Sequence, residues 1–262
     1  MPTKTSEPLT PFDDDALYEA QDLAFDAWEE SNPKKRIALV KKALHISPYC
    51  TDAYNILAEG TEDIGECVRL YTQGIDVGKK AFGKKFFKNN EGIFWGLIET
   101  RPYMRAMEGL ADCLWAQGER QKAIETYQEM LRLNPNDNQG VRYLLFYWLI
   151  AESMSEPAEK LFSDYREQSA FMLYGAVLLY FRQGRKVKAR NALKKAMEAN
   201  PHVPEFLLNP KKKYKPATEA EAYGYMFGHP SEANEYRRWA GEFWLEVPGA
   251  LDWMREQLQA IT

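Results

Sequence analysis

The sequence predicts an all-α fold of about five stacked helix pairs, followed by a helical C-terminal cap. Apolar residues recur three and four positions apart over most of the chain, which is the spacing of an amphipathic helix. Asn-Pro and Ser-Pro dipeptides close several of these helical stretches, and similar sets of small, aromatic and glycine residues precede them. A single helix pair cannot bury its own apolar stripe, so a chain with this pattern has to stack several pairs.

The clearest copy of the repeated pattern spans 104–135. Its characteristic residues are a Leu-small pair, a large apolar residue, a turn glycine, a small alanine, an aromatic residue and a closing proline: Leu110, Ala111, Leu114, Gly118, Ala123, Tyr127, Met130 and Pro135. Glycine permits the tight turn between the two helices, and the small residues let the paired backbones approach closely. This order and spacing resemble the tetratricopeptide repeat, and the resemblance implies a right-handed solenoid.

Four further segments carry the same pattern. Residues 170–201 repeat it, with Gly184, Ala189 and Pro201 at the turn, small and closing positions, and 138–169 repeat it with one inserted residue in the turn. Residues 17–48 are a looser copy, because Arg36 stands where the small alanine is expected, and 51–78 are a shortened one. Five copies exceed the three that a stable array requires.

The pattern divides the chain into five parts. In order, we expect an N-terminal arm (1–16), two degenerate repeats (17–78), an insertion (79–103), three repeats (104–201) and a C-terminal helical cap (202–262). The acidic run 13–15 lacks the alternating spacing of a calcium loop, and we interpret it as favourable charge at a helix N-terminus.

The last part carries its own helix signals. Thr218 and Glu221 form a capping box, Ser231 is a suitable N-cap, and Pro248 suits a first helical turn. Three helices are expected, with one break near 228–230 and another at 247–249. These aromatic-rich helices either cover the exposed face of the last repeat, as repeat arrays require, or form a second binding surface.

A closer resemblance covers roughly 94–208. It rests on the segments FWGLIETRPYMRAMEGLA (94–111), LNPNDNQGVRYLL (133–145) and NPHVPEFLL (200–208), which exceed what the repeat pattern demands. They look like segments of a tetratricopeptide-type group that includes bacterial proteins of unassigned role and the eukaryotic suppressor-of-tumorigenicity family. The role of that group is poorly defined, so the resemblance supports the fold more than a function.

Composition argues against several classes of protein. The formal net charge is −4, whereas a nucleic-acid-binding protein carries a basic surface. The longest near-continuous apolar stretch, 170–181, has 12 residues, fewer than the roughly 20 that span a membrane. Three scattered cysteines fit a reducing compartment, and the first residues lack the apolar region of a secretory signal, so we expect a cytoplasmic protein.

No catalytic or metal-binding constellation is visible in the sequence. Its three histidines are dispersed and form no HExxH pair, and no G-x-S-x-G, P-loop or dinucleotide-binding pattern occurs. We therefore expect no enzymatic activity, no cofactor and no metal.

The first helix of each pair is expected to line a concave groove, into which positions two, five, nine and twelve of each copy point. In the first copy these positions hold Tyr18, Gln21, Phe25 and Trp28. The predicted peptide-binding groove contains aromatic, arginine and asparagine side chains: Arg101, Tyr103, Arg105, Trp115, Asn138, Arg142, Phe146 and Tyr174. Arginine binds carboxylates through two parallel hydrogen bonds, and aromatic rings are good anchors. We expect a non-enzymatic scaffold that binds a peptide or protein segment with acidic groups.

Several of these residues have a structural alternative. Arg105 and Arg142 either contact a ligand or pair with Glu108 or Asp112. The apolar inner residues of the last copy either face the groove or pack against a neighbouring copy or the cap.

Some tetratricopeptide domains clamp a peptide's C-terminal carboxylate, and this sequence matches that clamp only in part. Asn55 and Arg105 agree with it in type, but Gly109 and Tyr143 stand where a basic residue or asparagine is expected.

Two lysine clusters, 79–88 and 211–215, suggest an alternative function as a nucleic-acid-associated adaptor. Phenylalanines interleave with the first cluster, and the lysines either contact an anionic partner or extend over these phenylalanines as they pack.

Overall fold

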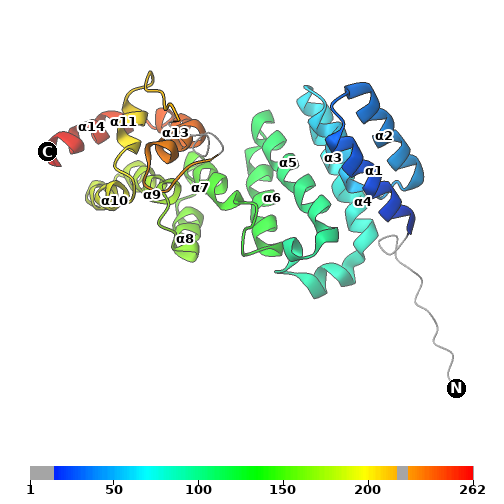
Figure 1. Cartoon of the computed structure of the whole chain (residues 1–262). Coiled ribbons are helices and arrows are strands. Elements are labelled where there is room, and N and C mark those ends of the chain that lie inside the picture. Colours follow the sequence, from blue (N-terminus) through cyan, green and yellow to red (C-terminus); the bar gives the residue numbers. More distant parts are fainter. Residues whose placement is uncertain (1–14, 217–223, 262) are drawn as a thin grey trace. The chain divides into compact units, whose positions relative to one another are not determined.

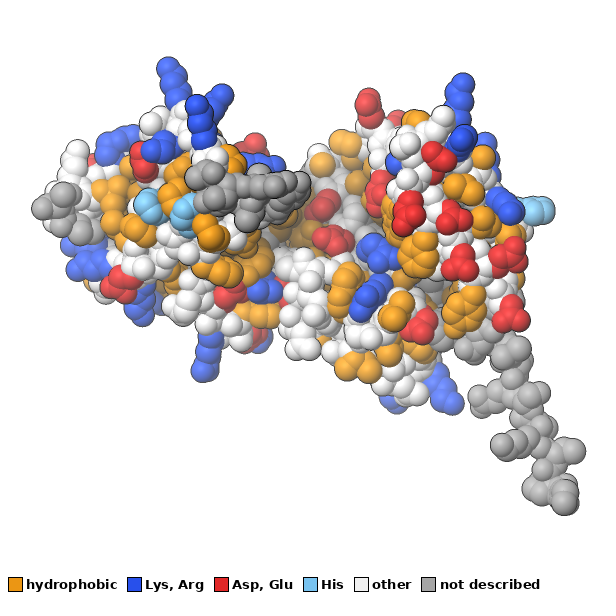
Figure 2. Space-filling model, in the orientation of Figure 1, with side chains coloured by type: hydrophobic (Ala, Val, Ile, Leu, Met, Phe, Trp, Pro, Cys, Tyr) orange, Lys and Arg blue, Asp and Glu red, His pale blue; other side chains and the backbone are white. Residues whose placement is uncertain are grey.

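The computed structural model describes residues 15–216 and 224–261. These residues form thirteen α-helices and two short 3-10 helices, and no β-strand occurs among them (Figure 1). The prediction of an all-α helical-repeat fold is therefore confirmed for this part of the chain. Asp13 and Asp14, and the capping box of Thr218 and Glu221, lie outside the described residues. The chain divides into two compact units, Met1–Val141 and Arg142–Thr262, and charged side chains lie over the surface of both (Figure 2).

The first unit consists of three helix hairpins. Its helices are α1 (Asp15–Glu29), α2 (Pro33–Ile46), α3 (Thr51–Glu59), α4 (Ile64–Asn90), α5 (Arg101–Gln117) and α6 (Arg120–Leu133). Consecutive helices pack as the pairs α1 with α2, α3 with α4 and α5 with α6, and the first helices of neighbouring pairs also touch. This is the arrangement that the repeat pattern predicts.

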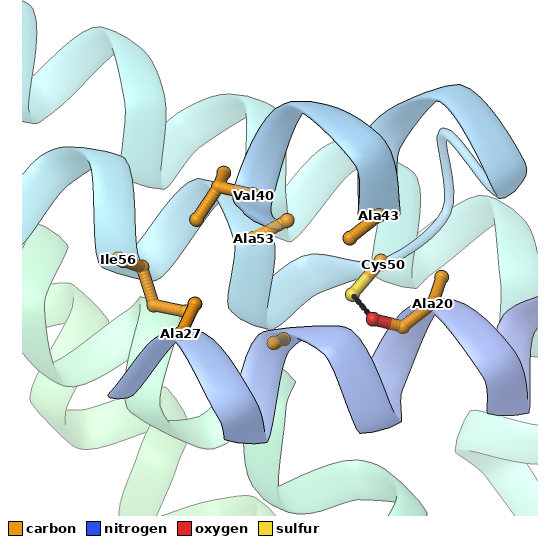
Figure 3. Close-up of a cluster of buried hydrophobic side chains, with 8 residues drawn as sticks. Ala20, Ala27, Val40, Ala43, Cys50, Ala53 and Ile56 are labelled. Carbon is orange, nitrogen blue, oxygen red and sulfur yellow. Dashed lines mark hydrogen bonds between the residues drawn. The ribbon is translucent and has the colours of Figure 1, made fainter. Parts of the chain in front are cut away.

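Small side chains hold the first hairpin together. Ala20, Ala24 and Ala27 lie on one face of α1 and are fully buried against α2 and α3 (Figure 3). Because alanine has no side chain beyond Cβ, the helix axes approach closely. Cys50 packs into the same cluster, with its Sγ 3.6 Å from the carbonyl oxygen of Ala20, and burial raises the pKa of its thiol to about 12. The Cys50 thiol is therefore a core group and a poor nucleophile.

The third hairpin is the copy with the clearest sequence pattern. Gly118 ends α5 in the left-handed conformation, with φ 88°, which glycine adopts without strain. Ala123 of α6 is fully buried, and Tyr127 donates a hydrogen bond of 2.5 Å from its hydroxyl to Asp112 of α5. The predicted register of this repeat is the observed one.

The segment 79–103, expected as an insertion, begins as a continuation of α4. This helix runs on to Asn90 across a kink at Gly83, where φ is 72° and ψ is 162°. Two 3-10 turns, η2 (Phe94–Gly96) and η3 (Ile98–Thr100), then lead directly into α5. Five aromatic rings pack together under this connection: Phe82, Phe86, Phe87, Phe94 and Tyr103.

The second unit contains the last repeats and the C-terminal helices. Its helices are α7 (Val141–Ala151), α8 (Ser155–Tyr165), α9 (Ala170–Arg182), α10 (Lys186–Ala199), α11 (Val203–Leu208), α13 (Pro230–Leu245) and α14 (Ala250–Ile261). The hairpin of α9 and α10 turns at Gly184, with φ 71°. The helix starts differ slightly from expectation: His229 rather than Ser231 caps α13, and α14 begins after Gly249, beyond Pro248.

Helix α13 packs on the inner face of the second unit. The ring of Tyr236 lies 5.6 Å from those of Phe171 and Tyr174, and its hydroxyl is 2.8 Å from that of Tyr147. The buried carboxylate of Glu232 accepts hydrogen bonds from the backbone N–H groups of Ala170 and Gly228 and from the side chain of Asn200. Helix α13 thus contacts Phe171 and Tyr174, two side chains that the repeat pattern directs into a groove.

Candidate peptide-binding groove

The first unit has an open groove on the side where its first helices lie. The groove encloses about 360 Å³. One wall is α1, a second is the stretch of α4 around Ala81, and the third is the segment 98–105. We call this feature the α1 groove. Its α1 wall includes Tyr18, Gln21 and Phe25, three of the positions predicted to face inward.

Large apolar side chains are exposed at the rim of the α1 groove. Tyr18 is 52% exposed, Phe25 46% and Ile98 67%. Contiguous exposed apolar surface of this kind marks interaction sites on otherwise polar proteins. Phe82 lies deeper and connects the groove to the aromatic cluster below it.

A buried ion pair lies behind the groove. Asp52 at the start of α3 is fully buried, and Arg105 of α5 donates hydrogen bonds to both of its carboxylate oxygens, from Nε at 3.1 Å and from Nη2 at 2.5 Å. The side-chain amides of Gln21 and Asn55 donate to the same carboxylate at 2.7 and 2.9 Å. The Arg105 guanidinium also lies over the ring of Trp28, 4.9 Å from its centre. Arg105 is therefore neutralised by the protein, through Asp52 rather than through Glu108 or Asp112.

Arg101 has a different environment at the mouth of the groove. Its Nε donates to the carbonyl oxygen of Trp95 at 3.1 Å, and its guanidinium lies 5.4 Å from the centre of that ring. Among residues 15–216 and 224–261 it forms no ion pair, and neither do Asp22 and Glu99 beside it. The charges that the groove leaves open are thus one guanidinium and two carboxylates.

Three of the predicted site residues in the first unit do not line this groove. Tyr103 is 2% exposed and belongs to the aromatic cluster, where burial raises the pKa of its hydroxyl. Trp115 is half-buried under the guanidinium of Arg120, 4.7 Å from its ring centre. Asn138 is exposed in the turn that precedes α7. Only Arg101 and Arg105 of the predicted set meet at the groove.

The remaining predicted residues lie in the second unit. Arg142 pairs with Glu167 through Nε at 2.8 Å and Nη2 at 2.6 Å, so its partner is neither Glu108 nor Asp112. Phe146 is fully buried and stacks on Phe162. Tyr174 is fully buried and donates from its hydroxyl to the carbonyl oxygen of Asn200 at 2.7 Å. The two aromatic side chains are core residues.

The second unit also has a larger hollow, of about 590 Å³, between α8, α9 and α10. It lies beside the second helices of the last two repeats. Several of its charges already pair with protein groups: Glu159 with Arg185 and Lys188, and Glu167 with Arg142. The α1 groove is the better candidate because its rim is apolar and its charges are open.

Sequence reasoning missed Asp52, which organises the network behind the groove. The signal was present, because Asp52 occupies position two of the copy 51–78, whose positions five and nine are Asn55 and Glu59. Applying the rule for inward positions fully to this degenerate copy places the carboxylate on the inner face, opposite Arg105.

The fold of stacked helix pairs is similar to that of tetratricopeptide-repeat proteins. Residues 105–137, most of α5 and α6, match the family model described as "Tetratricopeptide repeat". The fold is also similar to a solved structure, "YrrB: a TPR protein with an unusual peptide-binding site". That similarity has a TM-score of 0.50 at 20% sequence identity, over 70% of this chain and 84% of that one.

The chain is also similar to suppressor-of-tumorigenicity proteins, as the sequence segments suggested. "Protein ST7 homolog" of Drosophila melanogaster is 25% identical over 91% of this chain and 48% of its own length. "Suppressor of tumorigenicity 7 protein-like" is 24% identical in both Gallus gallus and Homo sapiens, over 91% and 92% of this chain. The chain spans about half the length of these relatives. The similarity extends well beyond the segment 94–208 that the sequence motifs marked.

No helix among residues 15–216 and 224–261 has both the length and the apolar character needed to cross a membrane. No group of three or more His, Cys, Asp or Glu side chains among them is arranged to hold a metal ion.

Proposed function

We propose that this chain is a protein-interaction scaffold that binds a peptide segment of a partner in the α1 groove. The observation that supports the proposal is the open apolar rim on the inner face of the first helices, beside the unpaired Arg101. An apolar side chain of the peptide enters beside Phe25 and Ile98, where part of its surface is removed from water. Arg101 donates hydrogen bonds to a carbonyl or carboxylate oxygen of the peptide.

The fold makes this role a natural one. Rigid packing of α1, α3 and α5 presents the groove in a fixed shape, so little conformational entropy is lost when a peptide binds. Asp52 and Arg105 act as a positioning pair, because the Asp52 carboxylate of α3 binds Arg105 in one groove wall and Gln21 in the α1 wall. The solved YrrB structure is described as having a peptide-binding site, and peptide binding is the function that we extend to this chain.

The lysine clusters give weaker support for the nucleic-acid alternative. The lysines of α4 are exposed, but the phenylalanines between them pack against one another and against Phe94. These rings are consequently not available to stack on bases, which single-stranded nucleic-acid sites require.

A selection from a displayed library of random dodecapeptides on the full chain tests the proposal. The affinity of the selected peptides is then measured by fluorescence anisotropy on the double variant Tyr18→Ser with Phe25→Ser. Loss of two aromatic anchors weakens binding by about 2 kcal/mol or more, which is about 30-fold.

The matched control is Val187→Ser with Leu245→Ser, which removes two exposed apolar side chains outside the groove. This control should bind like the wild type, and both variants should melt at nearly the wild-type temperature. Peptides that bind the groove variant as tightly as the wild type would exclude the α1 groove as the site.

A further inference from the structure

The α1 groove has an acidic border that the peptide must meet. Helix α1 contains five carboxylates and no basic residue: Asp15, Glu19, Asp22, Asp26 and Glu29. At 100° per residue they fall within an arc of about 80° on one side of the helix. All five side chains are exposed, and acidic side chains gather over the face of the first unit that carries α1 and α2 (Figure 2).

These carboxylates lack the partners that acidic residues have elsewhere in the protein. Within the described ranges none of the five forms an ion pair, whereas exposed pairs such as Arg69–Glu66, Lys160–Asp164 and Arg238–Glu235 recur on other helices. Like charges three and four residues apart destabilise a helix. A cation bound beside this stripe therefore relieves repulsion that the described residues leave uncompensated.

The two exposed aromatic rings of the groove are interleaved with the stripe. Tyr18 lies three residues after Asp15 and four before Asp22, and Phe25 lies three after Asp22 and four before Glu29. Each ring thus has a carboxylate on either side along the helix. A lysine or arginine side chain can lay its aliphatic stem, or its guanidinium plane, on such a ring and place its charge at the carboxylates.

The charges of the groove itself favour the same kind of ligand. Arg105 is already neutralised by Asp52, so it adds no open positive charge. Arg101 stands against Asp22 and Glu99 in the groove, and the rest of the α1 stripe lies next to them. A peptide rich in carboxylates would bring like charges together along α1.

We propose that the α1 groove selects a cationic peptide, one in which lysine or arginine residues flank an apolar anchor. The anchor enters the groove at Phe25, and the basic residues lie along the carboxylates of α1. This inference rests on the proposed function and specifies its partner class. It replaces the acidic ligand that the arginines suggested from the sequence alone.

The composition of the selected dodecapeptides gives the first test. The expected binders carry at least two lysine or arginine residues within a few positions of an aromatic or large aliphatic residue. Their affinity should fall as salt is raised, because the contacts along α1 are exposed to solvent.

The double variant Asp22→Lys with Glu29→Lys gives the second test, because these residues flank Phe25. Affinity for the selected peptide should fall about tenfold or more. A charge-swapped peptide, with its basic residues changed to glutamate, should bind this variant better than it binds the wild type. The control Glu156→Lys with Glu198→Lys changes the net charge equally at exposed residues of the second unit and should bind like the wild type.

The outcomes separate the two proposals. In one outcome, the selected peptides are acidic or uncharged, and their affinity falls with Tyr18→Ser and Phe25→Ser but does not change with the charge reversal on α1. This outcome would overturn the cationic partner and leave the proposed peptide groove supported. Peptides indifferent to both pairs of substitutions would overturn both. In another outcome, no basic peptide is selected, and sedimentation shows a dimer of the chain that dissociates when the charges of α1 are reversed. This outcome would overturn the cationic peptide in favour of a second copy of the chain.

Discussion

Replacing Asp52 by alanine should destabilise the first unit by about 2–3 kcal/mol. The Asp52 carboxylate accepts four hydrogen bonds, two from the Arg105 guanidinium and one each from Gln21 and Asn55, and it is fully buried. Breaking a buried ion pair costs about 3–5 kcal/mol when the remaining charge stays buried. Here the Arg105 side chain is 31% exposed, so its charge recovers part of its hydration and the effect is smaller.

The partners of Asp52 do not lose all their contacts in this variant. Asn55 keeps the hydrogen bond from its side-chain amide to the carbonyl oxygen of Pro102, at 3.0 Å. Arg105→Ala should be at least as destabilising as Asp52→Ala, because it leaves a carboxylate buried without its cation. The double variant should be more stable than the sum of the two effects predicts, by about 1–3 kcal/mol.

Urea unfolding monitored by circular dichroism and tryptophan fluorescence measures these free energies. Trp28, one of seven tryptophans, stacks on the Arg105 guanidinium, so part of the emission reports on this part of the first unit. The control is Glu62→Ala, an exposed residue of the same unit, which should change stability by less than 0.5 kcal/mol or so. Additive effects of Asp52→Ala and Arg105→Ala, or a loss as small as that of the control, would refute the assignment of this pair as a structural link.

Three further predictions follow from the fold. Ala123→Leu and Ala189→Leu should each lower stability by about 1–3 kcal/mol or more in thermal melts, because both alanines are fully buried at close helix contacts; melting at the wild-type temperature would show the repeat register to be wrong. Glu232→Leu should destabilise the C-terminal helices by about 1–3 kcal/mol, because it removes the acceptor of three hydrogen bonds, two of which are buried. Limited trypsin digestion should then release C-terminal fragments that the exposed variant Glu246→Leu does not. Burial raises the pKa of Cys50 to about 12 and that of the Tyr147 hydroxyl above its ordinary value. Because the unfolded chain releases these protons at lower pH than the folded chain, the free energy of unfolding should fall as pH rises above about 9. A circular dichroism signal unchanged at pH 12 would contradict this.

The helical pairs and their register were predictable because they depend on local signals. Gly118 and Ala123 mark the turn and the close contact of one hairpin, and the structure places both as expected. Each helix contacts mainly its sequence neighbours in a repeat array, so a pattern about thirty residues long is sufficient to fix it. Burial of Tyr103 was missed because the aromatic cluster around it comes from the segment 79–103, which the pattern does not cover.

The charged groups of the candidate site were harder to predict than its walls. Arg105 was placed correctly on the inner face, but its carboxylate partner is 53 residues away in sequence, on the helix of another pair. Such a pairing depends on how the hairpins stack. The charge that remains without an ion-pair partner in the groove can be determined only after the pairing of Arg105 with Asp52 is known. The spacing of the carboxylates of α1 can be read from the sequence. Whether these carboxylates can bind a ligand depends on which basic side chains form ion pairs elsewhere in the protein.

Helix α13 occupies, within the same chain, the surface of the second unit on which a peptide would bind. Tyr236 contacts Phe171 and Tyr174 where an anchor of an external peptide would otherwise sit, and it is joined to them by the same polypeptide. A tethered occupant has an effective concentration in the millimolar range or higher, independent of how much protein the cell contains. If the proposed function holds, an external peptide of ordinary micromolar affinity should not displace it. Among the described residues, we then expect the α1 groove, and not the inner face of the second unit, to respond to the concentration of a partner.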